Sequence, residues 1–153
     1  MMGQATKDLL HFVGVKHAHM VRTEKDAMAS LMLMPWDVLF TTWNTDQGNA
    51  NQLVTRVRKG DFDINRYTPI VVTSSAVTPS LLQAARDAGA HEVLGKPLTG
   101  QMIKDKVGAI LLRPRSFVAS DEFFGPDRRR RETEYKGPDR RLGRNRAKAS
   151  SGR

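Results

Sequence analysis

Apolar residues along the chain fall into short runs with two different spacings. Three runs are continuous and rich in β-branched or aromatic residues, which is typical of strands buried in a parallel sheet. They cover residues 36–43 (WDVLFTTW), 69–74 (PIVVTS) and 91–95 (HEVLG). A shorter run at residues 19–22 predicts a further strand.

Between these runs, apolar residues recur at the spacing of amphipathic helices. The predicted helices cover residues 4–13, 25–33, 53–59, 79–88 and 99–112. Gly60 and Gly89 are expected to end the third and fourth helices, and Thr78 precedes a proline at the start of the fourth. In the third helix we expect Arg58 to point outward. Alternating strands and helices indicate βαβ units, hence a parallel sheet with helices on both faces.

Composition divides the chain into two parts. The apolar runs stop before about residue 118, so residues 1–116 are predicted to form one domain and residues 117–153 a basic, largely disordered tail. Residues 125–153 hold eleven Lys or Arg and four Asp or Glu, so most of the net charge of +9 belongs to the tail. The phrase Gly-Pro-Asp-Arg-Arg occurs there twice, at 125–129 and 137–141.

Several classes of site are excluded or disfavoured. The chain has no cysteine, which excludes disulfides and thiolate metal sites. No apolar stretch approaches the length of a membrane span, and we expect a soluble, cytoplasmic protein. His17 and His19 lie on one face of the predicted strand, but a metal site lacks a third convergent ligand, so a plain strand-edge pair is favoured. No nucleophile and base pair stands out, which disfavours an enzyme.

Several of these motifs resemble the receiver (CheY-like) domain of bacterial response regulators. The resemblance covers roughly residues 4–112 and implies a flavodoxin-like doubly wound parallel sheet. It is carried by the strand DVLFTTW at 37–43, the strand at 69–73, ARDAGA at 85–90 and Gly-Lys-Pro at 95–97. The Phe-Gly-Pro-Asp-Arg-Arg tail is similar to one found behind some stand-alone bacterial receivers.

The resemblance implies a phosphate site with a substituted acceptor. Receivers place an aspartate nucleophile after the third strand, a Thr or Ser after the fourth and a Lys after the fifth. The corresponding residues here are Thr42, Thr73 and Lys96, with Pro97 where the family commonly has a cis proline. A threonine hydroxyl without an adjacent base is a poor acceptor, so we expect no phosphorylation by the usual route. Asp46 as a replacement acceptor is less favoured than an ordinary turn residue.

Two further departures affect the expected switch. The chain begins where the family's first helix is already under way, so the first strand and the acid pair that binds Mg²⁺ are expected to be absent, and no cofactor is predicted. The missing strand would lie between the second and third strands of the family's sheet. Either those two strands pair directly, a partner supplies the missing strand, or the true protein is longer. Val93 stands where many receivers carry a switching Tyr or Phe.

Alternatives stay open for the site residues and for the function. Lys96 is either a phosphate-site remnant or a surface lysine, and Thr73 is either a remnant or an ordinary strand residue. The leading hypothesis is a non-catalytic pseudo-receiver of a two-component phosphorelay that acts through protein partners such as a histidine kinase, with a homodimer as one option. The alternative is a basic adaptor that binds nucleic acid through its Arg-rich tail. The tail could also dock on its own domain or on a protein partner through Phe123, Phe124 and the Arg cluster, or it could be a solvated extension.

Overall fold

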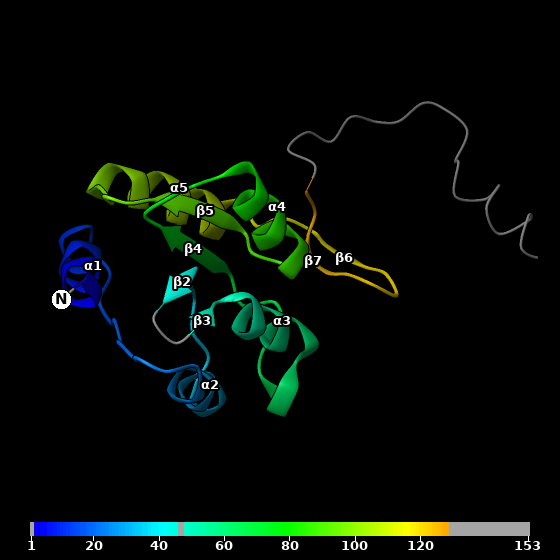
Figure 1. Cartoon of the computed structure of the whole chain (residues 1–153). Coiled ribbons are helices and arrows are strands. Elements are labelled where there is room, and N and C mark those ends of the chain that lie inside the picture. The colour runs from blue at the N-terminus through cyan, green and yellow to red at the C-terminus, as the bar shows by residue number, and fades with distance from the viewer. Residues whose placement is uncertain (1, 46–47, 129–153) are drawn as a thin grey trace, which may run out of the picture.

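A computed structural model describes residues 2–45 and 48–128 of the chain (Figure 1). Most of the predicted basic tail, including the second Gly-Pro-Asp-Arg-Arg phrase, lies outside the described residues. Within the described ranges, no helix is long and apolar enough to cross a membrane.

The main sheet consists of three parallel strands in the order β1-β4-β5. The strands are β1 (Leu39–Thr42), β4 (Ile70–Ser74) and β5 (Glu92–Gly95). All five residues of β4 are buried, which explains its continuous apolar and β-branched sequence. In register, Thr42 pairs with Thr73 and Ser74 pairs with Gly95, so the carboxyl ends of the three strands lie at one edge of the sheet.

In the described part of the chain, five α-helices accompany the sheet, and helices lie on both of its faces, as the alternating pattern predicts (Figure 1). They are α1 (Met2–Phe12), α2 (Glu24–Leu33), α3 (Asn51–Lys59), α4 (Pro79–Ala88) and α5 (Gly100–Leu112). Helix α1 packs beside α5, and α3 packs beside α4. Thr23, Thr78 and Thr99 cap α2, α4 and α5 by accepting a backbone N–H with the side-chain hydroxyl.

Turn chemistry ends the helices where the sequence predicts. Gly60 and Gly89 follow α3 and α4 with φ of 73° and 106°, the left-handed region that glycine adopts without a steric cost. A short 3₁₀ helix, Asp61–Asp63, continues from Gly60. After β1, the expected polar turn is a small antiparallel pair, β2 (Asn44–Thr45) with β3 (Gly48–Asn49).

The predicted strand at residues 19–22 is wrong. Among the described residues this segment forms no strand, so it does not pair directly with β1. It packs against the core through Val21, while the His19 ring stacks on Trp36 with ring centroids 6.0 Å apart. A strand needs backbone partners on a neighbouring strand, and none of the described residues supplies them here. Strand β1 is therefore at the edge of the described sheet and is only half-buried, although its sequence predicts full burial.

The folded structure continues beyond residue 116, where the tail was predicted to begin. Strands β6 (Phe117–Ala119) and β7 (Phe124–Pro126) form an antiparallel hairpin, and β7 contacts α3. Tyr67 packs edge-on against Phe117 and Phe124 with centroids 4.9 and 5.3 Å apart. These aromatic contacts explain why a segment without an obvious apolar run still folds onto the domain.

The hydrophobic core lies between the sheet and the helices α2, α3 and α4. It is built mainly from side chains of these four parts of the fold: Ala27, Met28, Leu31, Leu53, Val54, Val57, Ile70, Val72, Leu81 and Ala85. One expectation for this region is wrong: Arg58 on α3, predicted to point outward, is only 3% exposed.

Candidate functional site

The three residues of the predicted phosphate site meet at the carboxyl edge of the sheet. Thr42 ends β1, Thr73 lies near the end of β4, and Lys96 directly follows β5. The Thr42 and Thr73 hydroxyl oxygens are 3.3 Å apart, and Lys96 Nζ lies 3.3 Å from Thr42 Oγ1. Parallel pairing places the three residues together although 54 positions separate the first from the last.

The hydroxyls form a directed chain of hydrogen bonds. Thr73 Oγ1 donates to the Thr41 carbonyl at 3.4 Å, so its single proton is used. Thr42 then donates to Thr73 and accepts from the Lys96 ammonium group. Each of these hydrogen bonds is long and therefore weak, so a stronger acceptor could replace them easily. Thr73 is buried, whereas Thr42 and Lys96 are half-buried and border solvent.

The loop after β5 fixes the position of Lys96. The Lys96 backbone N–H donates to the Ser74 carbonyl at 2.8 Å, and the Lys96–Pro97 peptide bond is cis. A cavity of about 380 Å³ next to Lys96 is bounded on one side by Ala5, Thr6 and Leu9 of α1. The lysine thus stands at the mouth of a mostly apolar hollow between α1 and this loop.

The chemistry around Thr42 differs from that of a phosphoacceptor. Among the described residues, the side chains that contact its hydroxyl are Thr73 and Lys96, and neither is a carboxylate or imidazole that could act as its general base. Lys96 forms no ion pair with a described residue, so its charge is available to an anion.

These donors also do not fit Mg²⁺. The ion prefers carboxylate and other oxygen ligands, and an ammonium group beside it would repel it. The described residues contain no group of three or more His, Cys, Asp or Glu that could hold a metal ion. Asp46, the other acceptor considered, lies outside the described residues.

The histidines lie in separate environments. His11 Nδ1 contacts the Val15 carbonyl, and His19 Nδ1 contacts the Ser30 hydroxyl. His17 is exposed, and His91 is buried directly before β5. The pair at positions 17 and 19 lies on an irregular segment rather than on the predicted strand edge.

Sequence reasoning missed a buried polar network around Arg58. Its guanidinium donates to the carbonyls of Gly89, Arg66 and Thr68 at 2.8, 2.8 and 2.7 Å. Burial lowers the Arg58 pKa to about 9, which leaves the group charged at neutral pH. A signal was present in the sequence, because Arg58 shares a helix face with Val54 four residues earlier.

The same network fixes the protonation state of His91. Its Nδ1 accepts from the Ile70 backbone N–H at 3.2 Å and faces Arg58 Nη2 at 3.2 Å. Burial, and then the charges of Arg58 and Arg115, lower the His91 pKa to about 3. The imidazole is therefore neutral at neutral pH, and its proton lies on Nε2.

Arginine–aromatic contacts hold the hairpin on the domain. Arg58 and Arg66 lie over the Phe117 and Phe124 rings, 5.2 and 3.5 Å from their centroids. Arg128, in the first Gly-Pro-Asp-Arg-Arg phrase, pairs with Asp87 of α4 at 2.9 Å. The start of the predicted tail thus docks on its own domain through Phe124.

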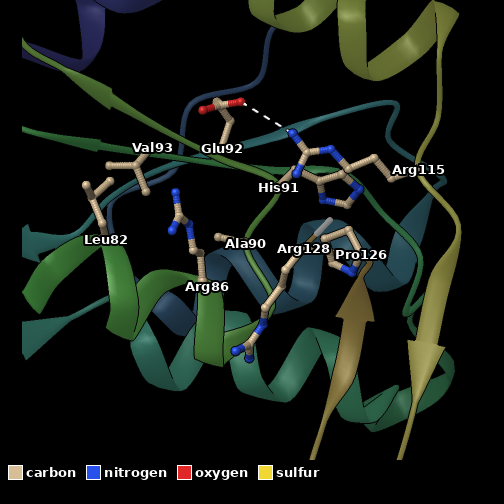
Figure 2. A pocket seen from close by; sticks show the side chains of 9 residues that line it. All are labelled: Leu82, Arg86, Ala90, His91, Glu92, Val93, Arg115, Pro126 and Arg128. Atoms are coloured by element: carbon tan, nitrogen blue, oxygen red, sulfur yellow. Dashed lines mark ion pairs between the residues drawn. The ribbon is translucent and has the colours of Figure 1, made fainter. Parts of the chain in front are cut away.

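The hairpin borders a basic pocket at the amino end of β5 (Figure 2). The cavity measures about 430 Å³ and is lined by side chains from α4, β5 and the segments around the hairpin. The charged lining residues are Arg86, Arg115, Arg128 and Glu92.

Comparisons with known proteins support a receiver fold. No protein-family model matches the sequence. The chain is similar to the sensory/regulatory protein RpfC of Xanthomonas campestris pathovar campestris, with 28% identity over 93 residues, which is 61% of this chain and 12% of RpfC. The match therefore spans a small part of that protein.

Solved receiver structures share most of the fold. Vibrio cholerae CheY4 has a TM-score of 0.63 and 20% identity, covering 72% of this chain and 89% of that chain. A two-component response regulator from Clostridium difficile has a TM-score of 0.63 and 22% identity, covering 74% and 91%. The signal receiver domain of a Syntrophus aciditrophicus histidine kinase has a TM-score of 0.61 and 20% identity, and the match covers 80% of this chain and 91% of that chain. The chain therefore has the fold of a response regulator receiver (CheY-like) domain, and its sequence is distantly similar to that of RpfC.

Proposed function

We propose that the chain is a pseudo-receiver: a two-component signalling module that acts by protein–protein interaction and takes no phosphoryl group at position 42. One observation carries the proposal. The residue at the predicted acceptor position is a threonine, and its hydroxyl forms hydrogen bonds with Thr73 and Lys96 as its side-chain partners within residues 2–45 and 48–128. A hydroxyl without a base is a weak nucleophile, so transfer from a phosphohistidine or a small phosphodonor is not supported.

The Thr73 hydroxyl and the Lys96 ammonium group would stabilise the site structurally instead of binding a phosphoryl group. Lys96 and Thr73 correspond to the groups that hold phosphoryl oxygens in an active receiver, and the proposal is supported by the hydrogen bonds of Lys96 to Thr42 and of Thr73 to the Thr41 carbonyl. We infer that the hydrogen bonds from Lys96 to Thr42 and from Thr42 to Thr73 hold the site in one state. Partners such as a histidine kinase or another signalling protein would then recognise a surface that phosphorylation does not regulate.

Beryllofluoride tests this proposal at equilibrium. It mimics a phosphoryl group by bonding to a carboxylate oxygen, so the native chain with Mg²⁺ should show no new slowly exchanging amide signals at Thr42, Thr73 or Lys96 in ¹H–¹⁵N spectra. The Thr42→Asp variant, which restores a carboxylate, is the matched control. New signals at these three positions in the native chain would contradict the proposal.

The basic tail supports a second candidate function, a nucleic-acid adaptor. Residues 125–153 carry eleven Lys or Arg against four acids, enough for salt-dependent phosphate contacts. Binding to DNA or RNA that falls steeply with salt, and that disappears when the chain is truncated after Arg128, would favour this candidate. Binding that survives truncation would place the contact on the folded domain instead.

We also propose that the folded unit ends after the hairpin rather than at residue 116. The support is the pairing of Phe117 with Pro126 and the ion pair between Arg128 and Asp87. The basic tail would then be residues 129–153.

A further inference from the structure

We propose that the basic pocket between α4, β5 and the hairpin is a binding site for a small molecule that bears a phosphate group. The pocket is separate from the Thr42 site: it lies at the amino end of β5, whereas Lys96 follows the carboxyl end. Its volume of about 430 Å³ falls within the range of about 300–1,000 Å³ that is usual for small-molecule sites.

Two arginines supply the charge. Figure 2 shows Arg86 of α4 and Arg115 of the segment after α5 entering the pocket from opposite sides. Arg86 has no side-chain partner among the described residues. Arg115 lies 3.9 Å from Glu92, which also pairs with Lys106 at 3.4 Å. Because Glu92 is shared between two cations, it neutralises the charge of Arg115 only in part. Guanidinium groups suit phosphate because they donate two hydrogen bonds in one plane.

A buried histidine provides a neutral donor. His91 is 8% exposed and lines the pocket, and its Nδ1 accepts from Ile70, so Nε2 carries the proton. Nε2 has no hydrogen-bond partner among the described residues. Among those residues, the one completely buried side-chain N or O atom without a partner is Arg66 Nε, so His91 Nε2 is not such an atom. His91 Nε2 is therefore not completely buried, and from the pocket wall it can donate to an oxyanion.

The remaining wall determines the kind of ligand. Leu82, Ala90, Val93 and Pro126 give the pocket an apolar side next to the arginines. A phosphate attached to a flat, partly apolar group would satisfy both parts, as a nucleoside monophosphate does. The chain's own following segment is a poor occupant, because residues 129–153 carry ten Lys or Arg and three acids, the same sign of charge as the pocket.

The test is a ¹H–¹⁵N NMR titration of the full chain with adenosine monophosphate and with pyrophosphate, at physiological salt, with adenosine as the uncharged control. We expect saturable shifts of the Arg86 and Arg115 Nε–H signals and of the His91 amide. Arg86→Gln and Arg115→Gln should each raise the Kd about tenfold or more, because each removes a charge-assisted hydrogen bond. Arg113→Gln, an exposed arginine outside the pocket, should leave the Kd unchanged.

Three results would overturn the proposal. The first is the absence of saturable shifts with either phosphate compound. The second is equal weakening by Arg113→Gln, which would indicate attraction to net charge alone. The third is a response confined to residues 129–153, which would assign the binding to the tail. Unchanged spectra away from the pocket confirm that each variant is folded.

Discussion

Arg58 and His91 face each other inside the domain, with Arg58 Nη2 3.2 Å from His91 Nδ1. Both are buried, and both contact Phe117 of the hairpin. Their contact joins α3, the start of β5 and the hairpin, three parts of the fold that are distant in sequence. The stability of the domain should therefore depend on this pair more than on any surface charge.

Replacing Arg58 should destabilise the fold strongly. Arg58→Met leaves the buried carbonyls of Gly89 and Thr68 and the part-buried carbonyl of Arg66 without their donors, and each loss at a buried group costs about 1–3 kcal/mol. We expect a decrease of at least about 3 kcal/mol in the free energy of unfolding, measured by urea denaturation. Lys59→Met, at the exposed neighbouring position, is the control and should change little. Equal effects of the two variants would contradict the role given to Arg58.

Acid should destabilise the domain through His91. Its pKa falls from the ordinary 6.5 to about 3 in the folded state, so the unfolded chain binds more protons between these values. This contribution to stability is complete above pH 6.5 and is lost as the pH falls toward 3, by about 1.4 kcal/mol per pH unit.

Unfolding measurements across this pH range check the contribution of His91. His91→Asn removes the titrating ring and should flatten the dependence, while His17→Asn controls for loss of an exposed imidazole. An unchanged slope in His91→Asn would show that His91 does not contribute.

Truncation should locate the end of the folded unit. A chain ending at Arg128 keeps Phe117 and Phe124 over Arg58 and Arg66, so its thermal midpoint should match that of the full chain. A chain ending at residue 116 exposes this surface and should lose about 1.5–3 kcal/mol for each of the two phenylalanines. Calorimetry of the two truncated chains compares them directly. Equal thermal midpoints of the two truncated chains would indicate that the folded unit ends at residue 116.

The sequence predicts those elements that depend on local chemistry. Thr78 before Pro79, the glycines after α3 and α4, and the apolar run of β4 define helices and strands with little tertiary help. Thr42, Thr73 and Lys96 could be chosen through the family resemblance, because parallel strands bring their carboxyl ends together.

The errors concern features that depend on tertiary partners. The segment at 19–22 has strand-like residues but no neighbouring strand among the described residues. Arg58 carries a charge that usually indicates solvent, and only the carbonyls around it explain its burial. The hairpin folds through aromatic and arginine contacts rather than through an apolar run, so composition placed it in the tail.

Phosphoryl uptake from acetyl phosphate with Mg²⁺, read by intact mass and peptide mapping, tests the pseudo-receiver proposal most directly. The native chain and Thr42→Asp are compared under the same conditions. The account predicts no phosphoryl adduct on the native chain, and an adduct gained by Thr42→Asp would show that Thr73 and Lys96 still bind phosphoryl oxygens. A stable adduct on the native chain, mapped to position 42 or to any aspartate near it, would contradict the account.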